Sequence, residues 1–368
     1  SFADSPIKPA TAADVVGVVN DISRFITDSD VPVGVALSGG IDSGAIALTS
    51  AAHSRQRLHA FTVGYDEHTA SDETEAARRV AEHAGITFHA LRVRTADVVA
   101  AYPETLWLKD DPNSDIAGPG YLAVMRAARA SGVPVLLVGQ GGDELFWGYP
   151  WLVEAAHRTR ARRNGVAAIL SAWVAYASGR LSSTQSLRSR LRHAVRDVRQ
   201  VMQDLGERSR QPLFFDTLID FQAADQVGNS FFKSSFLQQV DGRRPFEPLD
   251  RPEILDAPPE AALIQLICDT YLRENGLAQT DRLSMAASVE VRVPLVDYRL
   301  VELAYGHQIA AGSRINADKG LLREAFRELC PAWLLERPKR GFTPPVASWH
   351  AKIHHRYAPL VRGGILQE

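Results

Sequence analysis

Cysteine is scarce in this chain of 368 residues, which contains only Cys268 and Cys330. The two lie far apart in the sequence, and neither belongs to a C-x-x-C pair of the kind that binds zinc or cycles between thiol and disulfide. Because disulfides belong to oxidising compartments, the pattern indicates two reduced thiols and a cytoplasmic protein.

The chain also lacks an excess of either charge and lacks a long apolar run. Its net charge is -2, which argues against a surface built to hold a nucleic-acid backbone. No uninterrupted apolar stretch reaches the length of a membrane span, and we expect no signal peptide. With 45% hydrophobic residues, the chain can bury a sizeable core in one large domain or two.

The stretch that organises the chain is 31–50, VPVGVALSGGIDSGAIALTS. Its apolar, β-branched beginning predicts a strand buried on both faces of a parallel sheet. A small-residue turn follows, and then an alanine-rich segment that predicts a helix. Glycines let the turn approach a ligand closely, and the amide groups that begin a helix favour anions. The loop matches no Walker-type motif, since it carries Asp42 where a lysine would be needed, and this carboxylate can reach a magnesium ion that bridges phosphates.

Further strands and helices alternate with this unit. The hydrophobic patterns predict strands over 58–65, 87–93 and 133–139 and helices over 11–26, 71–84, 97–108 and 121–130. Such alternation predicts the α/β fold class, with a parallel twisted sheet flanked by helices. In these sheets ligands bind beyond the carboxyl ends of the strands, so the loops 38–43 and 139–149 are expected to face one site.

Beyond residue 150 the chain changes character. Helical patterns over 151–204, 259–277 and 297–305 predict a mostly helical C-terminal part. The basic clusters at 157–163 and 188–199 are interpreted as solvated helix faces, and contact with a partner or nucleic acid stays an alternative.

Four later motifs add candidate residues. The sequence reads GQGGDELFWGY over 139–149, DRLSMAASVEVRVPLVD over 281–297, KGLLR over 319–323 and RPKRGF over 337–342. The first of these follows a predicted strand and contains Asp143, which suits a second magnesium contact. The other three, taken singly, are typical of a helix that runs into a turn and of surface lysines.

Together the five motifs, in this order and spacing, resemble the synthetase domain of glutamine-hydrolysing asparagine synthetases. The first loop alone resembles the pyrophosphate-binding loop of the ATP pyrophosphatases, the PP-loop superfamily. The resemblance runs from about Pro32 to Trp349 and implies an adenine nucleotide α-hydrolase-like fold. It implies a leader and helix at 1–30 and a synthetase domain at 31–368, in which the nucleotide-binding core (31–150) is followed by a mainly helical remainder (151–368) that completes the site.

The resemblance also assigns roles to residues, with ATP and Mg²⁺ as cofactors. It implies that Asp42 and Asp143 hold the metal, and that the catalytic residues are Lys319, Lys339, Asp143 and Gln140. The residues implied to bind ATP and its pyrophosphate are Ala36, Leu37, Ser38, Gly39, Gly40, Asp42, Ser43, Val63, Gly64, Gly139, Gly141 and Gly142.

The implied reaction adenylates a carboxylate, most simply the β-carboxylate of L-aspartate, and releases pyrophosphate. Ammonia then gives asparagine and AMP. One alternative is an amidotransferase or cyclase that acts on another carboxylate, for example in sugar-amide or peptide-macrocycle formation. A non-catalytic nucleotide-binding subunit is a further alternative, which the presence of Asp42, Asp143, Lys319 and Lys339 together disfavours. The implied partners are a small carboxylate substrate and ammonia, without nucleic acid or membrane, and a homodimer stays open.

Two departures from the family pattern limit this interpretation. The N-terminal glutaminase half, with its cysteine nucleophile, is absent from the sequence, so we expect nitrogen from free ammonia, from a glutaminase domain or subunit, or from an amine substrate. Gln140 stands where asparagine synthetases carry an acidic residue and where β-lactam-forming relatives carry a tyrosine. An amide can hydrogen-bond but cannot act as a general base, which disfavours the β-lactam alternative.

Overall fold

The computed structural model of the chain describes residues 9–67, 72–110, 115–171, 202, 205–206, 213–215, 234–239, 252–311, 318–337 and 344–362. The chain divides into two compact units. The first contains residues up to Gly148 together with Cys268–His307 and the chain from Asp318 onward, and the second contains Tyr149–Ile267 and Gln308–Ala317. Segments far apart in the sequence therefore belong to the first unit.

A five-stranded sheet forms the centre of the first unit, in the order β3-β2-β1-β4-β5, and all neighbouring strands are parallel. The strands are β1 (Val33–Ala36), β2 (His59–Tyr65), β3 (Thr87–Val93), β4 (Val135–Leu137) and β5 (Glu290–Arg292). The predicted α/β class and the first four strands are confirmed. Strand β5 was not predicted, because its segment was expected to be a helix that runs into a turn, although Val289, Val291 and Val293 alternate there with two charged residues.

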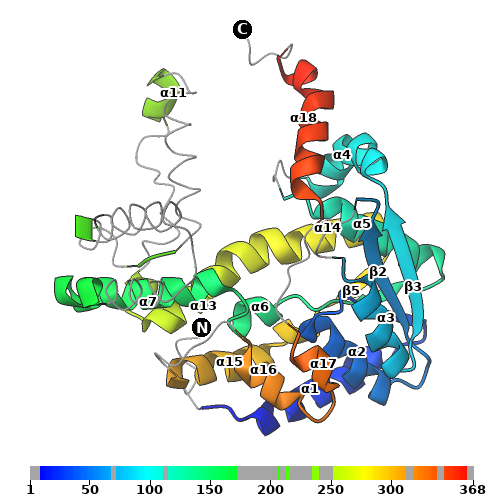
Figure 1. The fold of residues 1–368 in the computed structure, drawn as a ribbon, viewed down its shortest axis with the longest axis horizontal. Coiled ribbons are helices and arrows are strands. Elements are labelled where there is room, and N and C mark those ends of the chain that lie inside the picture. Colours follow the sequence, from blue (N-terminus) through cyan, green and yellow to red (C-terminus); the bar gives the residue numbers. More distant parts are fainter. Residues whose placement is uncertain are drawn as a thin grey trace, which may run out of the picture. The chain divides into compact units, whose positions relative to one another are not determined.

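Two groups of helices flank the sheet (Figure 1). The first group is α1 (Ala12–Thr27), α2 (Ile41–His53) and α3 (Thr74–His83), and the second is α4 (Thr95–Lys109), α5 (Gly118–Ala130), α14 (Ala278–Ala286) and α18 (Val346–Arg362). Shorter or connecting elements of this unit are α6 (Gly142–Leu145), the π-helix η3 (Cys268–Leu277), the 3₁₀ turn η4 (Pro294–Val296), α16 (Gly320–Ala325) and α17 (Ala332–Leu335), and α15 (Tyr298–Ala311) begins in it. The helices predicted before residue 150 are confirmed, with ends that agree to within three residues.

Helix α1 shows how local sequence fixes an element end. The Thr11 backbone amide donates to the Asp14 carboxylate at 2.8 Å, and the Asp14 amide donates to the Thr11 hydroxyl at 3.2 Å. This reciprocal pair is a capping box, which satisfies amides that the helix itself cannot.

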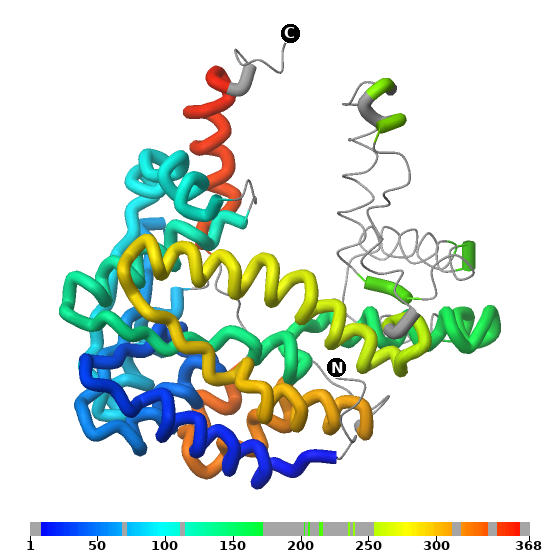
Figure 2. Tube along the Cα trace, turned by 180° about the vertical axis from the view of Figure 1, so that it is seen from behind, coloured from blue at the N-terminus to red at the C-terminus, as the bar shows by residue number. Residues whose placement is uncertain are grey.

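The C-terminal helix α18 packs beside α4, as the view from behind shows (Figure 2). Trp349 is fully buried there and lies edge-on to Tyr65, with ring centres 5.4 Å apart. Its indole nitrogen donates to the Thr95 hydroxyl at 3.2 Å, and the Tyr357 hydroxyl donates to the Val99 carbonyl at 2.8 Å. A residue near the end of the chain therefore closes the core beneath the second helix group.

The described residues of the second unit are mainly helical, with α7 (Pro150–Asn164), α11 (Ser234–Gln239), α12 (Pro252–Leu255) and α13 (Pro259–Ile267). The prediction that 157–163 is a solvated helix face is wrong. Thr159 and Arg162 are buried, and Arg160 pairs with the buried Glu260 of α13. The cluster at 188–199 lies outside the described residues. Across the described part of the chain, no helix combines the length and apolarity that crossing a bilayer requires.

Replacing Trp349 by alanine tests the docking of α18. We expect Trp349→Ala to lower the free energy of unfolding by about 3–5 kcal/mol, the usual cost of truncating a buried aromatic side chain. Trp107→Ala is a matched control, because Trp107 on α4 is 83% exposed. The midpoint of thermal unfolding, followed by circular dichroism, should fall for the first variant alone. Equal midpoints for the two variants would contradict the packing described here.

Candidate active site

The loop between β1 and α2 is braced by its own hydroxyl groups. The Ser38 amide donates to the Ser43 hydroxyl at 3.1 Å, and the two hydroxyl oxygens are also 3.1 Å apart. Gly39 has φ +70°, a backbone conformation that L side chains rarely adopt. Gly40 is the N-cap of α2 and provides no side-chain acceptor, so the first amides of the helix form the kind of anion site expected at a helix start.

The loop that follows β4 lies directly against the first loop. A methyl group added to Gly142 would lie 2.5 Å from the carboxylate carbon of Asp42, and one added to Gly139 would lie 3.0 Å from the Ser43 amide nitrogen. Gly141 takes a left-handed conformation, with φ +94°. The absence of side chains at these glycines is therefore what lets the two loops meet.

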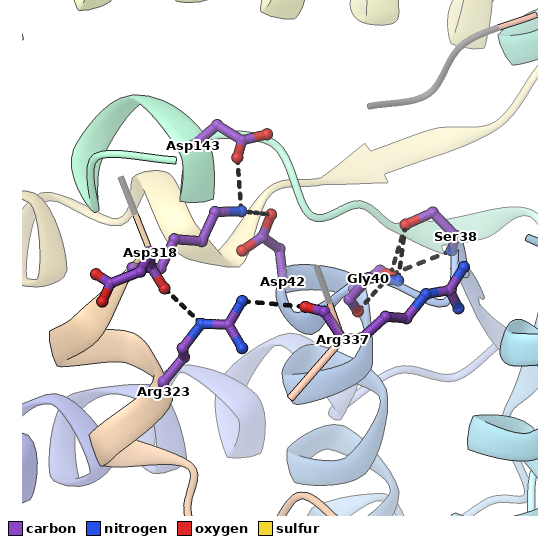
Figure 3. Close-up of polar contacts among 9 residues, drawn as sticks. Ser38, Gly40, Asp42, Asp143, Asp318, Arg323 and Arg337 are labelled. Atoms are coloured by element: carbon purple, nitrogen blue, oxygen red, sulfur yellow. Dashed lines mark hydrogen bonds and ion pairs between the residues drawn. The ribbon is translucent and has the colours of Figure 1, made fainter. Parts of the chain in front are cut away.

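Lys319 joins the two loops electrostatically (Figure 3). Its ammonium group forms an ion pair with the Asp42 carboxylate and lies 2.6 Å from Oδ1 of Asp143. The lysine side chain is 4% exposed, while those of Asp42 and Asp143 are 16% and 19% exposed. The structure thus brings together three residues that the family resemblance implied for the site, from positions up to 277 residues apart.

The pKa of Lys319 is raised above its ordinary value. Burial is the largest single effect and lowers the pKa, but the attraction of Asp42 and Asp143 and their hydrogen bonds together outweigh it. The side chain is therefore an ammonium at neutral pH, and it supplies a fixed positive charge at the junction of the two loops.

The backbone around this cluster is unusual. Lys319 is the N-cap of α16 and has φ 57° and ψ 41°, and Trp147 has φ 57°. Such left-handed conformations of non-glycine residues store strain and cluster at functional sites. Gly148 follows Trp147 directly. A methyl group added to Gly148 would collide with Oδ1 of Asp143 and would lie 2.5 Å from Cε of Lys319. The site therefore leaves no room for a side chain at residue 148.

Two arginines that the sequence reasoning missed fasten the C-terminal motifs to the first loop. Arg337 donates to the Gly39 carbonyl at 3.2 Å and to the Glu73 carboxylate at 3.1 Å. Arg323 donates to the carbonyl oxygens of Asp318 and Arg337 (Figure 3). Both arginines stand inside the motifs KGLLR and RPKRGF, so the motifs were the available signal. Lys339 lies outside the described residues.

The residues implied for adenine and ribose lie at the carboxyl ends of β1 and β2. Ala36 pairs with Phe61 across the two strands, and the Leu37 amide donates to the Phe61 carbonyl at 2.9 Å. Val63 is buried, and a methyl group added to Gly64 would lie 2.9 Å from the Thr74 hydroxyl oxygen. These residues therefore share the sheet edge on which the phosphate loop begins.

Gln140 has a partner that the sequence did not suggest. Its side-chain nitrogen donates to the Thr280 hydroxyl at 2.7 Å and to the Gly276 carbonyl at 3.3 Å. Both partners lie where the π-helix η3 passes into α14. Thr280 precedes the motif that begins at Asp281, and no motif covered it.

The two carboxylates suit a magnesium ion. Mg²⁺ is usually held by one or two carboxylates together with the phosphates of its substrate. Asp42 and Asp143 already converge on one cation, the Lys319 ammonium, so the donor set fits. In the described part of the chain no group of three or more His, Cys, Asp or Glu side chains could hold a metal.

Comparisons with known proteins give matches over most of this chain. The family model described as asparagine synthase matches residues 21–363. A putative glutamine-hydrolysing asparagine synthetase of Mycobacterium tuberculosis is 31% identical over 95% of this chain and 51% of that protein. Asparagine synthetase 3 of Bacillus subtilis is 24% identical over 94% of this chain and 49% of that protein. The amidase chry2 of Gibberella zeae is 26% identical over 92% of this chain and 53% of that protein. The chain thus spans about half the length of the curated relatives it matches.

Removing the Lys319 ammonium should turn the carboxylate pair into a site that binds Mg²⁺ without nucleotide. In Lys319→Met, repulsion between Asp42 and Asp143 is relieved by a divalent ion, which stabilises the fold by about 2.7 kcal/mol when its concentration is 100 times its Kd. We expect MgCl₂ to raise the unfolding temperature of this variant by several degrees more than that of the wild-type protein. The double variant Asp42→Asn/Lys319→Met should not show this additional rise in unfolding temperature. An equal Mg²⁺ response in all three proteins would show that the carboxylates do not form a metal pair.

Proposed function

We propose that this chain, which belongs to the asparagine synthase family, is an ATP-dependent ligase that forms a carbon–nitrogen bond. In this proposal it transfers AMP from ATP to a carboxylate, releases pyrophosphate, and then joins nitrogen to the activated carbon. The observation that carries the proposal is the buried Lys319 ammonium between Asp42 and Asp143, directly beside a glycine loop at a helix start. These groups are what a departing pyrophosphate requires.

The first half of the proposed reaction separates charge. A carboxylate oxygen attacks the α-phosphorus, the bond from that phosphorus to its bridging oxygen breaks, and negative charge develops on pyrophosphate. Ser38, Gly39, Gly40 and Ser43 would bind this anion through amide and hydroxyl groups, and Lys319 would neutralise part of its charge. Magnesium, held by Asp42 and Asp143, would supply further charge neutralisation when bound.

The remaining residues have proposed roles around this centre. Ala36, Leu37, Val63 and Gly64 would lie along adenine and ribose, while Gly139, Gly141 and Gly142 would let the second loop approach the phosphates. Lys339 would contact the reacting phosphate. Arg337, two positions earlier, already donates to the carbonyl of Gly39 in the phosphate loop, which supports that role.

We propose L-aspartate as the carboxylate substrate, because the five motifs of this chain match asparagine synthetases in order. A different carboxylate substrate is the second candidate. The neutral residue at position 140 and the likeness of this chain to an amidase favour it. Nitrogen would come from ammonia, supplied free or by a glutaminase domain or subunit. The predicted cytoplasmic location stays a prediction.

Pyrophosphate release tests the proposal most directly. The purified chain is incubated with ATP, Mg²⁺ and L-aspartate, with and without ammonium chloride. We expect release that depends on aspartate, and asparagine and AMP as products when ammonium is present. A folded chain that binds ATP but releases no pyrophosphate with aspartate would overturn aspartate as the substrate and favour another carboxylate.

The variant Asp42→Asn tests the chemical step. It removes the charge that faces Lys319 and one of the two proposed metal ligands, so pyrophosphate release should fall by at least about 100-fold. Asp21→Asn is the control, because Asp21 is exposed on α1. Circular dichroism should show a folded protein in both cases. Near-wild-type turnover by Asp42→Asn would exclude the mechanism.

A further inference from the structure

The peptide bond between Gly39 and Gly40 is the link of the phosphate loop that its own sequence constrains least. Both residues lack Cβ, so the peptide plane between them can turn over at little steric cost. A planar trans peptide points its N–H and its carbonyl oxygen in opposite directions. One orientation of this peptide therefore offers a hydrogen-bond donor to an anion, and the reversed orientation offers an oxygen that repels it.

Arg337 contacts this peptide at its carbonyl. Nη1 of Arg337 donates to the Gly39 carbonyl at 3.2 Å, and a methyl group added to Gly39 would lie 3.0 Å from the same nitrogen. The Gly40 amide faces the other way and donates to the Ser38 hydroxyl at 3.3 Å. That hydroxyl oxygen lies 3.1 Å from the hydroxyl oxygen of Ser43. The carbonyl is thus turned toward the arginine, and the amide is turned toward the two serines.

The guanidinium group of Arg337 is itself held in one orientation. Its Nη2 donates to the Glu73 carboxylate at 3.1 Å, and the two side chains are only 16% and 10% exposed. Arg323 donates to the backbone carbonyl of Arg337 at 3.2 Å (Figure 3). Because a guanidinium is a planar fork, fixing one nitrogen on Glu73 also fixes the direction of the other. Glu73 is the N-cap of α3, so Arg337 ties the peptide of the loop to the start of that helix.

We propose that Arg337 is a positioning residue that keeps the Gly40 amide turned toward the pyrophosphate group, and that Glu73 holds Arg337 for this task. This inference rests on the proposed function. In the reversed orientation the Gly39 carbonyl would face the hydroxyls of Ser38 and Ser43. Those hydroxyls would then donate to the carbonyl instead of to the phosphates. Arg337 thus strengthens the binding of pyrophosphate through the loop, by holding the carbonyl away from it.

This role is confined to the phosphate end of the nucleotide. Adenine and ribose are proposed to lie along Ala36, Leu37, Val63 and Gly64, and Arg337 acts on the peptide that follows Gly39. Loss of the arginine should therefore weaken the binding of pyrophosphate and of ATP, and should leave the binding of adenosine unchanged. A general disturbance of the fold would weaken all three.

Equilibrium binding tests the inference without reference to the carboxylate substrate. Isothermal titration calorimetry measures the Kd of pyrophosphate and of ATP, both with Mg²⁺, and the Kd of adenosine. Arg337→Met keeps the length of the side chain and removes its donors. We expect the Kd of pyrophosphate and of ATP to rise roughly ten-fold, the size of one charge-assisted hydrogen bond. The Kd of adenosine should keep its wild-type value.

Glu73 provides a second and milder variant. Glu73→Gln keeps an acceptor for Arg337 but removes the charge, so the Kd of pyrophosphate should rise a few-fold. In an Arg337→Met background Glu73→Gln should add nothing, since a residue that acts only through Arg337 couples fully to it. Arg79→Met is the matched control. Arg79 is an exposed arginine of the same helix, and its guanidinium lies 4.1 Å from the ring centre of Trp333 on α17. This variant should leave all three constants unchanged.

The outcomes separate this inference from the function on which it rests. A wild-type protein that binds pyrophosphate and ATP, with unchanged constants in Arg337→Met, would overturn the inference and leave the proposed function standing. An equal loss of adenosine binding would overturn it as well, because the arginine would then support the fold in general. If Arg337→Met does not fold, an unchanged pyrophosphate Kd in Glu73→Gln contradicts the inference. A folded wild-type protein that binds neither ATP nor pyrophosphate would overturn the proposed function.

Discussion

The ion cluster of Asp42, Lys319 and Asp143 is the constraint on which the rest of the site depends. Taking an ammonium and two carboxylates largely out of water is costly, and the mutual attraction offsets that cost only if all three stay close. Three separate segments, at α2, α6 and α16, must therefore be held in place. The glycines at 142 and 148 follow from the same demand, since a side chain at either would occupy the space that the charges need.

Much of this arrangement could be predicted from the sequence, because the loops that follow the strands of a parallel α/β sheet lie at the carboxyl ends of those strands. Once 31–50 and 133–149 were identified as strands followed by glycine loops, their meeting at one edge followed from topology. The order of the five motifs fixed the family. What pattern alone could not supply was which individual side chains touch across long distances in the sequence. Nothing near Thr280 marks it as a partner of Gln140.

Charge patterns were the least reliable guide. The cluster at 157–163 has the composition of a solvated helix face, yet Arg160 pairs with the buried Glu260 and Arg162 is itself buried. A sequence shows which residues carry charge but not where the opposite charge lies, and Glu260 is 100 positions away. The same limit applies to Lys319. It looks like a surface lysine until Asp42 and Asp143 are folded against it, and its left-handed backbone has no signature in KGLLR.

The phosphate loop and the side chain of Gln140 differ in the charge of the groups around them. The groups that face the phosphate loop are ionic, because the departing pyrophosphate gains negative charge and is stabilised by fixed positive charge. The side chain of Gln140, by contrast, has neutral partners, the Thr280 hydroxyl and the Gly276 carbonyl. A glutamate at this position would place a negatively charged oxygen against the Gly276 carbonyl, which can only accept a hydrogen bond. A neutral amide fits these partners, because its nitrogen donates to both of them.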